Sequence, residues 1–479
     1  MNYKAIVGTL GKVMMITAAF LCVPMAVGII YGENTILPFA IPACALLVIG
    51  FVFYLCTKNG DKHIYAKEGF IIVAVSWIVM SLVGSLPFII SGEIPNFWDA
   101  FFETVSGFTT TGATVLPDVE ILSHGIQFWR ISTHWIGGMG VLVFLLAIIP
   151  RSEGLMHIFR AESTGPSSSK LVAKMSYTAR ILYAIYGFLT LAETVLLLCG
   201  GAGVYDAVLT AFSTAGTGGF SMYNDSIAHF NSAYIETVVA VFMMLFGVNF
   251  NVFYLILIGQ FKKAVKSEEL HAYLIILLTA TAIITVNLLS ISMNFITALR
   301  YAFFQVASIS STTGFASYNF GEWPALSRGI MLCLTVIGAC GGSTGGGIKV
   351  ARLTILIKAG VKDVRKLLRP RSALTVKFEG EPLDKQIRGN VRTYATIWAL
   401  LVVSATMLIS IFDNDLFTNF LSTLSCIGNV GPIMNEMGPL FTFGAYTSFS
   451  KIVLCVLMLA GRLEIFPIII LFSPLAWKK

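Results

Sequence analysis

Charged side chains are scarce in this sequence. Asp, Glu, Lys and Arg make up 12% of its 479 residues, about half of the roughly 25% found in soluble domains. Hydrophobic residues make up 56%, and residues 36–56 and 70–90 contain no charged side chain. A helix of about 20 apolar residues crosses the hydrocarbon core of a bilayer. The sequence therefore excludes an ordinary soluble domain and predicts an integral membrane protein.

Signals for metal or redox chemistry are also missing. The eight cysteines are scattered through apolar runs without a C-x-x-C pair, and the six histidines show no metal-ligand spacing. We expect the cysteines to be small apolar fillers and His134 to be a hydrogen-bonded interior histidine. Because no nucleophile–base pair is visible, we expect neither an enzyme nor a covalently bound cofactor.

Apolar segments suitable for ten membrane spans run through the chain. Such segments must be helical, because backbone polar groups in lipid need partners within the segment. The first one follows Lys4 and Lys12, as in a signal peptide, but it is long and lacks a convincing cleavage site, so we interpret it as a retained span. The predicted spans are residues 8–31, 36–56, 69–91, 126–150, 181–200, 233–259, 271–293, 327–359, 391–412 and 448–473.

Basic residues are unevenly distributed between the loops. Loops 92–125, 201–232 and 413–447 contain no Lys or Arg, whereas a dense basic group extends from Lys349 to Arg392. By the positive-inside rule, both termini are cytoplasmic and the loops without basic residues lie outside. The net charge of +7 reflects this asymmetry, so no nucleic-acid partner is expected. Four cytoplasmic residues are expected to contact anionic membrane lipid or a partner protein: Arg365, Lys366, Arg369 and Arg371.

Four outer loops repeat one pattern, an apolar stretch too short to span a membrane and then a polar turn that contains a glycine. The stretches lie near 97–109, 204–216, 296–310 and 416–427, and the glycines are Gly112, Gly219, Gly314 and Gly431. A serine stands six residues before each glycine: Ser106, Ser213, Ser308 and Ser425. Stretches of this length are candidates for re-entrant helices, which are tolerated only when they are buried in protein or line a water-filled cavity.

The pattern predicts an all-α polytopic membrane protein with four fused span–half-helix–span repeats around a pseudo-fourfold pore. The first two spans stand outside the repeat. The predicted units are an N-terminal two-span segment at 1–64 and pore repeats at 65–155, 176–265, 268–365 and 386–479.

The glycine turns have the composition of a cation filter. Rings of backbone carbonyls can replace the water shell of a monovalent cation, and glycine reaches the backbone conformations that bring such carbonyls together. Half-helices that run inward would point their partly negative C-terminal ends at the cavity. We expect the serines to support the turns through nearby backbone carbonyls. The candidate ion-binding residues are Thr110, Thr111, Gly112, Thr217, Gly218, Gly219, Thr312, Thr313, Gly314, Asn429, Val430 and Gly431.

Two features outside the glycine turns are further candidates for a functional role. The eighth span is interrupted by the glycine-rich segment 338–347, which we expect to be irregular and mobile because glycine disfavours helix; the alternative is a simple break of the helix at a packing site. The segment does not match G-x-x-x-x-G-K-[ST], so a phosphate loop is not expected. Arg462 lies in the last span, where a charge is costly and by default a functional candidate. It either faces the pore or bonds structurally to neighbouring carbonyls, and Glu464 is a poor partner because it lies on another helix face.

The turns Thr110-Thr111-Gly112, Thr217-Gly218-Gly219-Phe220, Thr312-Thr313-Gly314-Phe315 and Gly428-Asn429-Val430-Gly431 resemble, in this order and topology, those of the TrkH/TrkG/KtrB superfamily of potassium transporters. The two leading spans make the chain more similar to the TrkH branch. The resemblance implies a homodimer in the bacterial cytoplasmic (inner) membrane with potassium at the filter residues. It also implies a cytoplasmic TrkA-like regulatory subunit, on which alone a nucleotide is expected. The fourth turn departs from the pattern at Asn429-Val430 and Pro432, which weakens the expectation of a symmetric filter.

The resemblance also implies a gate beneath the filter, formed by Arg462 and by the glycines of the intramembrane loop: Gly338, Gly341, Gly342, Gly345, Gly346 and Gly347. The expected function is gated potassium uptake, and the sequence leaves open whether it is channel-like or symport. The alternative is a secondary transporter of another cation or small solute, coupled to sodium or protons. That class predicts two related halves and intramembrane carboxylates, whereas the sequence shows four units and no Asp or Glu in the turns.

Overall fold

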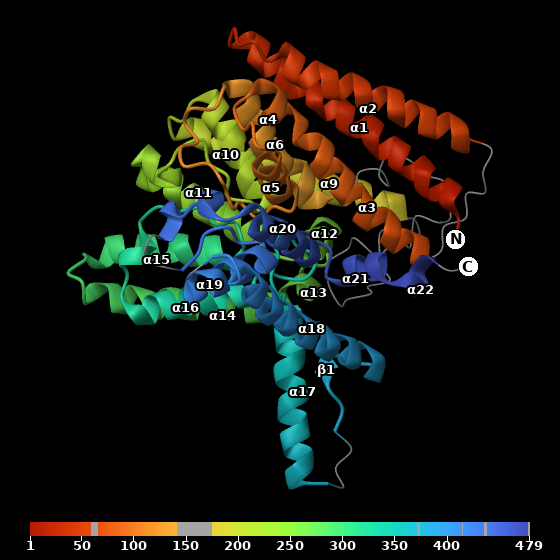
Figure 1. Cartoon of the computed structure of the whole chain (residues 1–479). Coiled ribbons are helices and arrows are strands. Elements are labelled where there is room, and N and C mark those ends of the chain that lie inside the picture. The colour runs from red at the N-terminus through yellow and green to blue at the C-terminus, as the bar shows by residue number, and fades with distance from the viewer. Residues whose placement is uncertain (59–65, 141–174, 371–373, 414, 435–437, 478–479) are drawn as a thin grey trace.

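The computed structural model consists of helices packed into one bundle, with a single helix projecting from it (Figure 1). The model describes residues 1–58, 66–140, 175–370, 374–413, 415–434 and 438–477. In these ranges the strands are β1 (Lys377–Phe378) and β2 (Glu381–Pro382), which pair antiparallel. Because each strand has only two residues and the other described elements are helices, the predicted all-α fold is confirmed.

Six of the described helices are long and apolar enough to cross a membrane. They correspond to the predicted first, second, third, fifth, seventh and ninth spans. These are α1 (Tyr3–Ile30), α2 (Ile36–Thr57), α3 (Ala66–Gly84) continued by α4 (Leu86–Ser91), α9 (Met175–Cys199), α14 (Glu268–Leu289) and α18 (Lys385–Ile409).

The first two spans pack against each other through glycine. A Cβ on Gly11 would lie 2.8 Å from the Gly50 carbonyl oxygen, and a Cβ on Gly50 would lie 2.7 Å from that of Gly11. The two backbones can therefore approach closely, as small residues allow in membrane helices. Many outward side chains of α2, such as Leu37 and Val48, are exposed, which suits a lipid-facing surface.

The four predicted half-helices are present, and each ends at its glycine turn. Two of them begin with a side-chain cap, since Asn96 and Asp415 each accept hydrogen bonds from two backbone N–H groups of the first turn. The half-helices are α5 (Phe97–Phe108), α10 (Val204–Gly216), α15 (Phe295–Ser310) and α19 (Leu416–Gly428).

The helices that follow the turns are interrupted more often than the sequence analysis predicted. The expected break in the eighth span separates α16 (Ala325–Ile337) from α17 (Val350–Leu368). The predicted sixth span is wrong as one helix, because α11 (Ala233–Phe246) and α12 (Phe250–Leu257) meet at 89°. The tenth span is also wrong as one helix, since it divides into α20 (Ser448–Arg462) and α21 (Phe466–Phe472).

Local chemistry explains these two additional breaks. At the first, the Asn249 side chain caps α12 by accepting from the Asn251 N–H, which starts a new helix in a new direction. At the second, Glu464 and Ile465 have φ of 58° and 67°, and Pro467 stands in the first turn of α21. In the predicted fourth span, α6 (His124–Met139) ends before Gly140, whose φ is 78°; the rest of that span lies outside the described residues.

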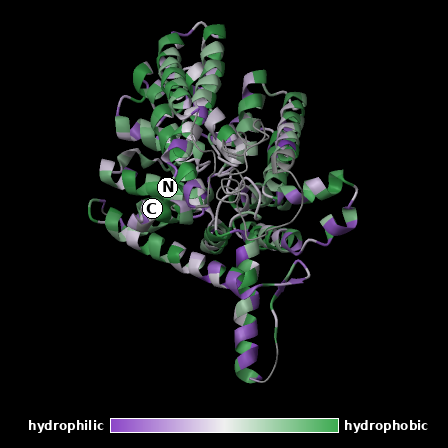
Figure 2. Cartoon of the chain, turned by 90° about the vertical axis from the view of Figure 1, so that its right-hand side faces the viewer, coloured by the Kyte–Doolittle hydropathy of each residue, from purple (hydrophilic) through white to green (hydrophobic). Residues whose placement is uncertain are grey.

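The projecting helix is α17, the continuation of the glycine-rich segment (Figure 1). Hydrophilic residues are dense along it, whereas hydrophobic residues predominate on the bundle (Figure 2). The beginning of α1 and the last described helix, α22, lie on the same side of the bundle (Figure 1). The remaining short helices are α13 (Phe261–Val265), α22 (Pro474–Trp477), η1 (Ser226–Phe230), η2 (Phe320–Glu322), η3 (Gly438–Leu440) and η4 (Phe443–Ala445).

Candidate functional site

The four half-helices end in the same backbone motif. Two residues before each glycine, the chain adopts a left-handed conformation, with φ of 55°, 55°, 62° and 52° at Thr110, Thr217, Thr312 and Asn429. The next N–H then donates to the carbonyl of the serine in the repeat, at 2.8–3.1 Å in all four copies. This is the hydrogen bond of a Schellman C-cap. The serine column of the sequence therefore marks the position whose carbonyl closes the cap.

Each turn thus contains two left-handed residues, where the sequence analysis expected only the glycine. A left-handed conformation costs a non-glycine residue about 1–2 kcal/mol, and it is a genuine outlier for a β-branched residue such as threonine. Asparagine tolerates it better, which accounts for Asn429 as the substitute for threonine in the fourth turn. The shared strain indicates that the surrounding structure fixes all four turns.

The four glycines close the turns into a ring. Their φ values are 79°, 80°, 84° and 94° in chain order. A Cβ on any of them would lie 2.6 Å or less from a carbonyl oxygen of the next turn. The oxygens met by Gly112, Gly219, Gly314 and Gly431 belong to Gly218, Thr313, Val430 and Thr111 respectively. In every case this is the residue directly before the neighbouring glycine, so the same relationship recurs four times around the ring.

One pocket of about 120 Å³ opens onto this ring, and all four glycines line it. Its wall also includes residues that follow the glycines, among them Phe220 and Pro432. The predicted filter segments, which are far apart in the sequence, are therefore brought together around a common space.

Hydroxyl groups brace the turns from within the protein. The Thr111 and Thr313 hydroxyls bond to those of Thr109 and Ser311 at 2.8 and 2.7 Å. The Asn429 amide donates to the Thr111 hydroxyl at 3.0 Å, which links the fourth turn to the first. These side chains hold neighbouring main chains in place.

The repeated serines differ in their side-chain contacts. The hydroxyls of Ser308 and Ser425 donate to carbonyls of Phe315 and Gly431 at 2.6 and 2.8 Å. Those of Ser106 and Ser213 have no hydrogen-bond partner among the described residues. The expected bonding of the serine hydroxyls to nearby carbonyls thus occurs in two of the four copies.

The glycine-rich segment 338–347 lies against the ring. The Gly346 N–H donates to the Thr312 hydroxyl at 2.7 Å, and a Cβ on Gly346 would lie 3.0 Å from the Asn429 Cβ. A Cβ on Gly345 would lie 2.6 Å from the Ser311 carbonyl oxygen. The segment therefore packs under the third and fourth turns, and its glycines permit that close approach.

The break between α11 and α12 holds the same segment. The Cys340 N–H donates to the Gly247 carbonyl at 3.0 Å, and the Phe250 N–H donates to the Gly342 carbonyl at 3.1 Å. The buried Glu269 carboxylate accepts from the Gly341 N–H at 2.5 Å and from the Asn249 side chain at 3.2 Å. The sequence does not single out Glu269 or Asn249, because a charge at the start of a span and a polar residue within one are common without such a role.

Lys349, at the end of the glycine-rich segment, turns back onto it. Its ammonium group donates to the carbonyl of Gly345, and the side chain is buried. The segment is thus anchored by a cation from its own end and by the Glu269 carboxylate from α14.

Arg462 joins three repeats through carbonyl groups. Its guanidinium donates to Thr344 at 2.5 Å and to Gly137 and Gly138 at 2.6 Å each. The first acceptor belongs to the glycine-rich segment, and the other two lie at the end of α6. Glu464 pairs instead with Arg352 of α17, as expected from its different helix face. Arg462 and the glycine-rich segment, the two parts of the predicted gate, are therefore in contact through Thr344.

A bundle of membrane-length helices with four half-helices that meet in a ring of glycine turns is the architecture of a multi-pass membrane transport protein. The family model of TrkH, described as a cation transport protein, matches residues 39–478, and the chain belongs to this family. The resemblance drawn from the glycine turns is thereby confirmed.

Relatives match over the whole chain. The Trk system potassium uptake proteins TrkH of Salmonella typhimurium and Escherichia coli K12 are 34% and 33% identical to it, with 100% of each chain covered. The crystal structure of the potassium transporter TrkH from Vibrio parahaemolyticus is 30% identical, superposes with a TM-score of 0.91, and covers 100% of both chains.

Proposed function

We propose that this protein takes up potassium ions across the inner membrane of a bacterium, with the ring of four glycine turns as its selectivity filter. The observation that carries the proposal is the recurring contact of each glycine with a carbonyl of the next turn. Carbonyl dipoles fixed in a ring can take over the hydration shell of a monovalent cation. The relatives named above are potassium uptake proteins, which favours potassium as the ion.

The electrostatics of the half-helices support the same function. All four end at the ring, so the partial negative charge of each C-terminal end, about half an electron, lies next to it. The membrane potential provides a sufficient driving force for uptake, since about 2.3 kcal/mol per charge at 100 mV supports roughly a fiftyfold gradient.

The gate of this pathway is, in our proposal, the glycine-rich segment together with Arg462. The segment packs directly under two of the turns, where irregular backbone can obstruct an ion. Arg462 places a fixed positive charge beside it, and such a charge lowers cation occupancy most where water is scarce. The bonds of Arg462 to Thr344 and to the end of α6 would then hold the closed state.

Assembly and topology complete the proposal. A TrkA-like nucleotide-binding subunit docks on the cytoplasmic side near residues 349–392, and two copies of the chain form a homodimer with a pore in each. Arg365 and Lys366 lie in the last turn of the projecting α17, and Arg369 directly follows it, where a partner can reach them; Arg371 lies outside the described residues. Both termini are cytoplasmic, which agrees with the position of the beginning of α1 and of α22 on the same side of the bundle (Figure 1), and the repeats divide at the boundaries given above.

A proton-coupled transporter is the second candidate, and one observation favours it. Glu193 lies in the membrane-length helix α9 and its side chain is fully buried, and buried intramembrane carboxylates commonly serve as proton relays. If uptake is coupled to protons through this residue, Glu193→Gln should alter the dependence of potassium uptake on the proton gradient. If that dependence is unchanged in the variant, the result favours the uncoupled pathway.

Growth at low potassium tests the proposed function. A bacterial strain that lacks potassium-uptake membrane proteins but keeps its TrkA-like subunit should grow at limiting potassium when it expresses this chain. Failure to grow, with the protein present in the inner membrane, would contradict potassium uptake.

A further inference from the structure

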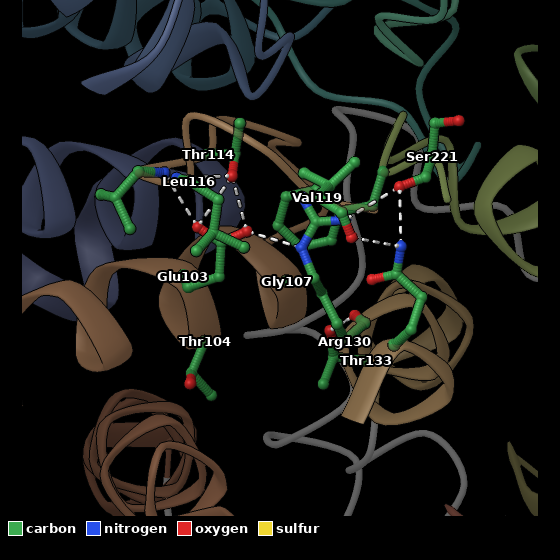
Figure 3. A network of polar contacts seen from close by, with 12 residues as sticks. Glu103, Thr104, Gly107, Thr114, Leu116, Val119, Arg130, Thr133 and Ser221 are labelled. Atoms are coloured by element: carbon green, nitrogen blue, oxygen red, sulfur yellow. Dashed lines mark hydrogen bonds and ion pairs between the residues drawn. The ribbon is translucent and has the colours of Figure 1, made fainter. Parts of the chain in front are cut away.

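Behind the ring, a buried ion pair joins α5 to α6. The Arg130 Nε lies 2.7 Å from the Glu103 Oε1, and the two side chains are 2% and 0% exposed. Figure 3 shows them pointing toward each other, with Thr114 on one side and Ser221 on the other. Arg130 also lines the pocket that opens onto the ring, which places the pair beside the four glycines.

Both members of the pair also hold the irregular segments that follow the first two glycine turns, residues 113–116 and 220–222, which we call the outer strands of these turns. The Glu103 carboxylate accepts from the Thr114 hydroxyl at 2.9 Å and from the Val115 N–H at 3.0 Å, just after Gly112. The Arg130 Nη1 donates to the Ser221 carbonyl at 3.0 Å, two residues after Gly219. One ion pair therefore connects the outer strands of the first and second turns (Figure 3).

His134 lies one helical turn after Arg130 on the same face of α6 and binds the second glycine turn. Its Nε2 accepts from the Phe220 N–H at 3.1 Å, so Nδ1 carries the proton and donates to the Gly107 carbonyl at 2.7 Å. The Phe220 ring stacks on the imidazole at 4.2 Å and lies 3.7 Å from the Arg130 guanidinium. The second turn is thus held both by its backbone and by its aromatic side chain.

This contact explains an irregularity in the repeat. The second turn has Gly218 where the first and third have Thr111 and Thr313. A Cβ on Gly218 would overlap the imidazole ring of His134. The additional glycine of this turn is therefore required by the histidine behind it.

The charge balance of the pair has a consequence for a cation. Arg130 lines the same pocket as the four glycines, and its positive charge is compensated by Glu103. Removing the carboxylate would leave an uncompensated positive charge in a buried site, where it would repel cations that enter the ring. The pair therefore fixes two strands without adding net charge to the entrance.

We propose that Glu103 and Arg130 are positioning residues that set the ion preference of the filter by fixing the outer strands of its first two turns. This inference rests on the proposed filter function. Because the pair bonds to the segments that follow the turns, its loss should change the spacing of the filter carbonyls rather than remove one of them.

The test compares Glu103→Gln and Arg130→Lys in liposomes, with potassium and sodium flux measured at matched protein content. Both variants should lower the potassium-to-sodium flux ratio by about fivefold or more, the effect of one or two lost hydrogen bonds. Glu103→Gln should also raise the half-saturating potassium concentration, because Arg130 stays charged. Arg130→Lys keeps the charge balance but loses the fork that reaches Ser221, so its half-saturation should stay close to that of the wild type.

Asp99→Asn is the matched control. Asp99 lies on the same half-helix, one turn further from the ring, and pairs with Lys451 at 2.5 Å; this variant should keep the wild-type flux ratio. Gly219→Ser is measured in parallel. If Gly219→Ser lowers the ratio while both pair variants keep it within about twofold, the positioning role is wrong and the filter stands. If Gly219→Ser also leaves the ratio unchanged, the proposed filter itself fails.

Thr114→Val covers the case in which the charged variants do not reach the membrane. It removes the hydroxyl that donates to the Glu103 carboxylate and accepts from the Leu116 N–H, and it keeps the side-chain shape, so it should lower the ratio by about two- to threefold. An unchanged ratio in folded Thr114→Val would overturn the proposal.

Discussion

A Cβ atom on Gly431 would lie 2.6 Å from the carbonyl oxygen of Thr111, so the last glycine turn of the chain abuts the first. The same relationship links the first turn to the second, the second to the third, and the third to the fourth. The ring is therefore closed by backbone-to-backbone contacts between segments that are distant in the sequence. A substitution at any one of these glycines should therefore displace the neighbouring turn of the ring.

Serine substitutions at the ring glycines should weaken the preference for potassium over sodium and leave the protein in the membrane. Each added side chain meets a neighbouring carbonyl and must adopt a left-handed conformation at about 1–2 kcal/mol. The closest approaches are at Gly112 and Gly219 and the widest is at Gly431, so Gly431→Ser should be the mildest variant. Relative permeability of the two ions gives the measurement.

Gly329→Ser is the control for this series. Gly329 lies on α16 in the same repeat as Gly314, and a Cβ there would have no neighbour within 4 Å. It should behave as the wild type. Wild-type selectivity in all four ring variants would mean that the ring is not the filter.

Arg462→Ala should raise potassium flux in the absence of the regulatory subunit, because it removes both the positive charge and the bonds that hold the glycine-rich segment. Arg462→Lys should raise flux less, since the charge remains. Deletion of residues 341–346 should also raise flux with ion preference nearly intact. Flux is compared at equal expression in the membrane, and if neither the deletion nor the alanine variant exceeds the wild type, the gate lies elsewhere.

Thr312→Val tests the contact between the third turn and the glycine-rich segment. It removes the acceptor of the Gly346 N–H, and one hydrogen bond of about 1 kcal/mol predicts roughly a fivefold increase in flux through the unregulated protein. Thr285→Val is the matched control, because the buried Thr285 hydroxyl donates only to its own helix, at the Thr281 carbonyl. Equal flux in the two variants would show that this contact does not hold the gate closed.

Charge reversal on α17 tests the docking site. Glutamate in place of Arg365, Lys366 and Arg369 should abolish capture of the purified TrkA-like subunit, because these residues lie at the end of the projecting helix and directly after it. Ion preference should not change, since these residues lie at the far end of the helix that projects from the bundle (Figure 1). If the triple variant still captures the subunit, the docking surface does not lie on α17.

Much of the fold follows from periodic apolar runs and from the repeated glycine, but the geometry of the site depends on contacts that sequence spacing does not encode. The left-handed conformation of Thr110 goes against the preference of threonine, so only the surrounding structure could reveal it. The break at Ile465 likewise contradicts the preference of a β-branched residue. Both positions show tertiary contacts overriding local preference.

Pairings between distant residues were the second part that the sequence could not supply. Arg462 was recognised as a functional candidate because a charge within a span is costly, yet its acceptors at Gly137 and Gly138 are backbone atoms more than 300 residues away. Glu103 and Arg130 were not recognised, because a polar residue in a half-helix and another in the following span carry no signal that they meet. The prediction that His134 is a hydrogen-bonded interior histidine is confirmed, since both of its ring nitrogens form hydrogen bonds.

The most direct test of the central claim is the ion preference of the purified protein in liposomes, measured as flux of potassium, rubidium, sodium and lithium under an imposed membrane potential. The account predicts that potassium and rubidium pass well ahead of sodium and lithium in the wild type, and that Gly219→Ser brings the four fluxes closer together. Equal fluxes of all four ions in the wild type, or a preference that survives Gly219→Ser unchanged, would contradict the claim that the glycine ring is a potassium filter.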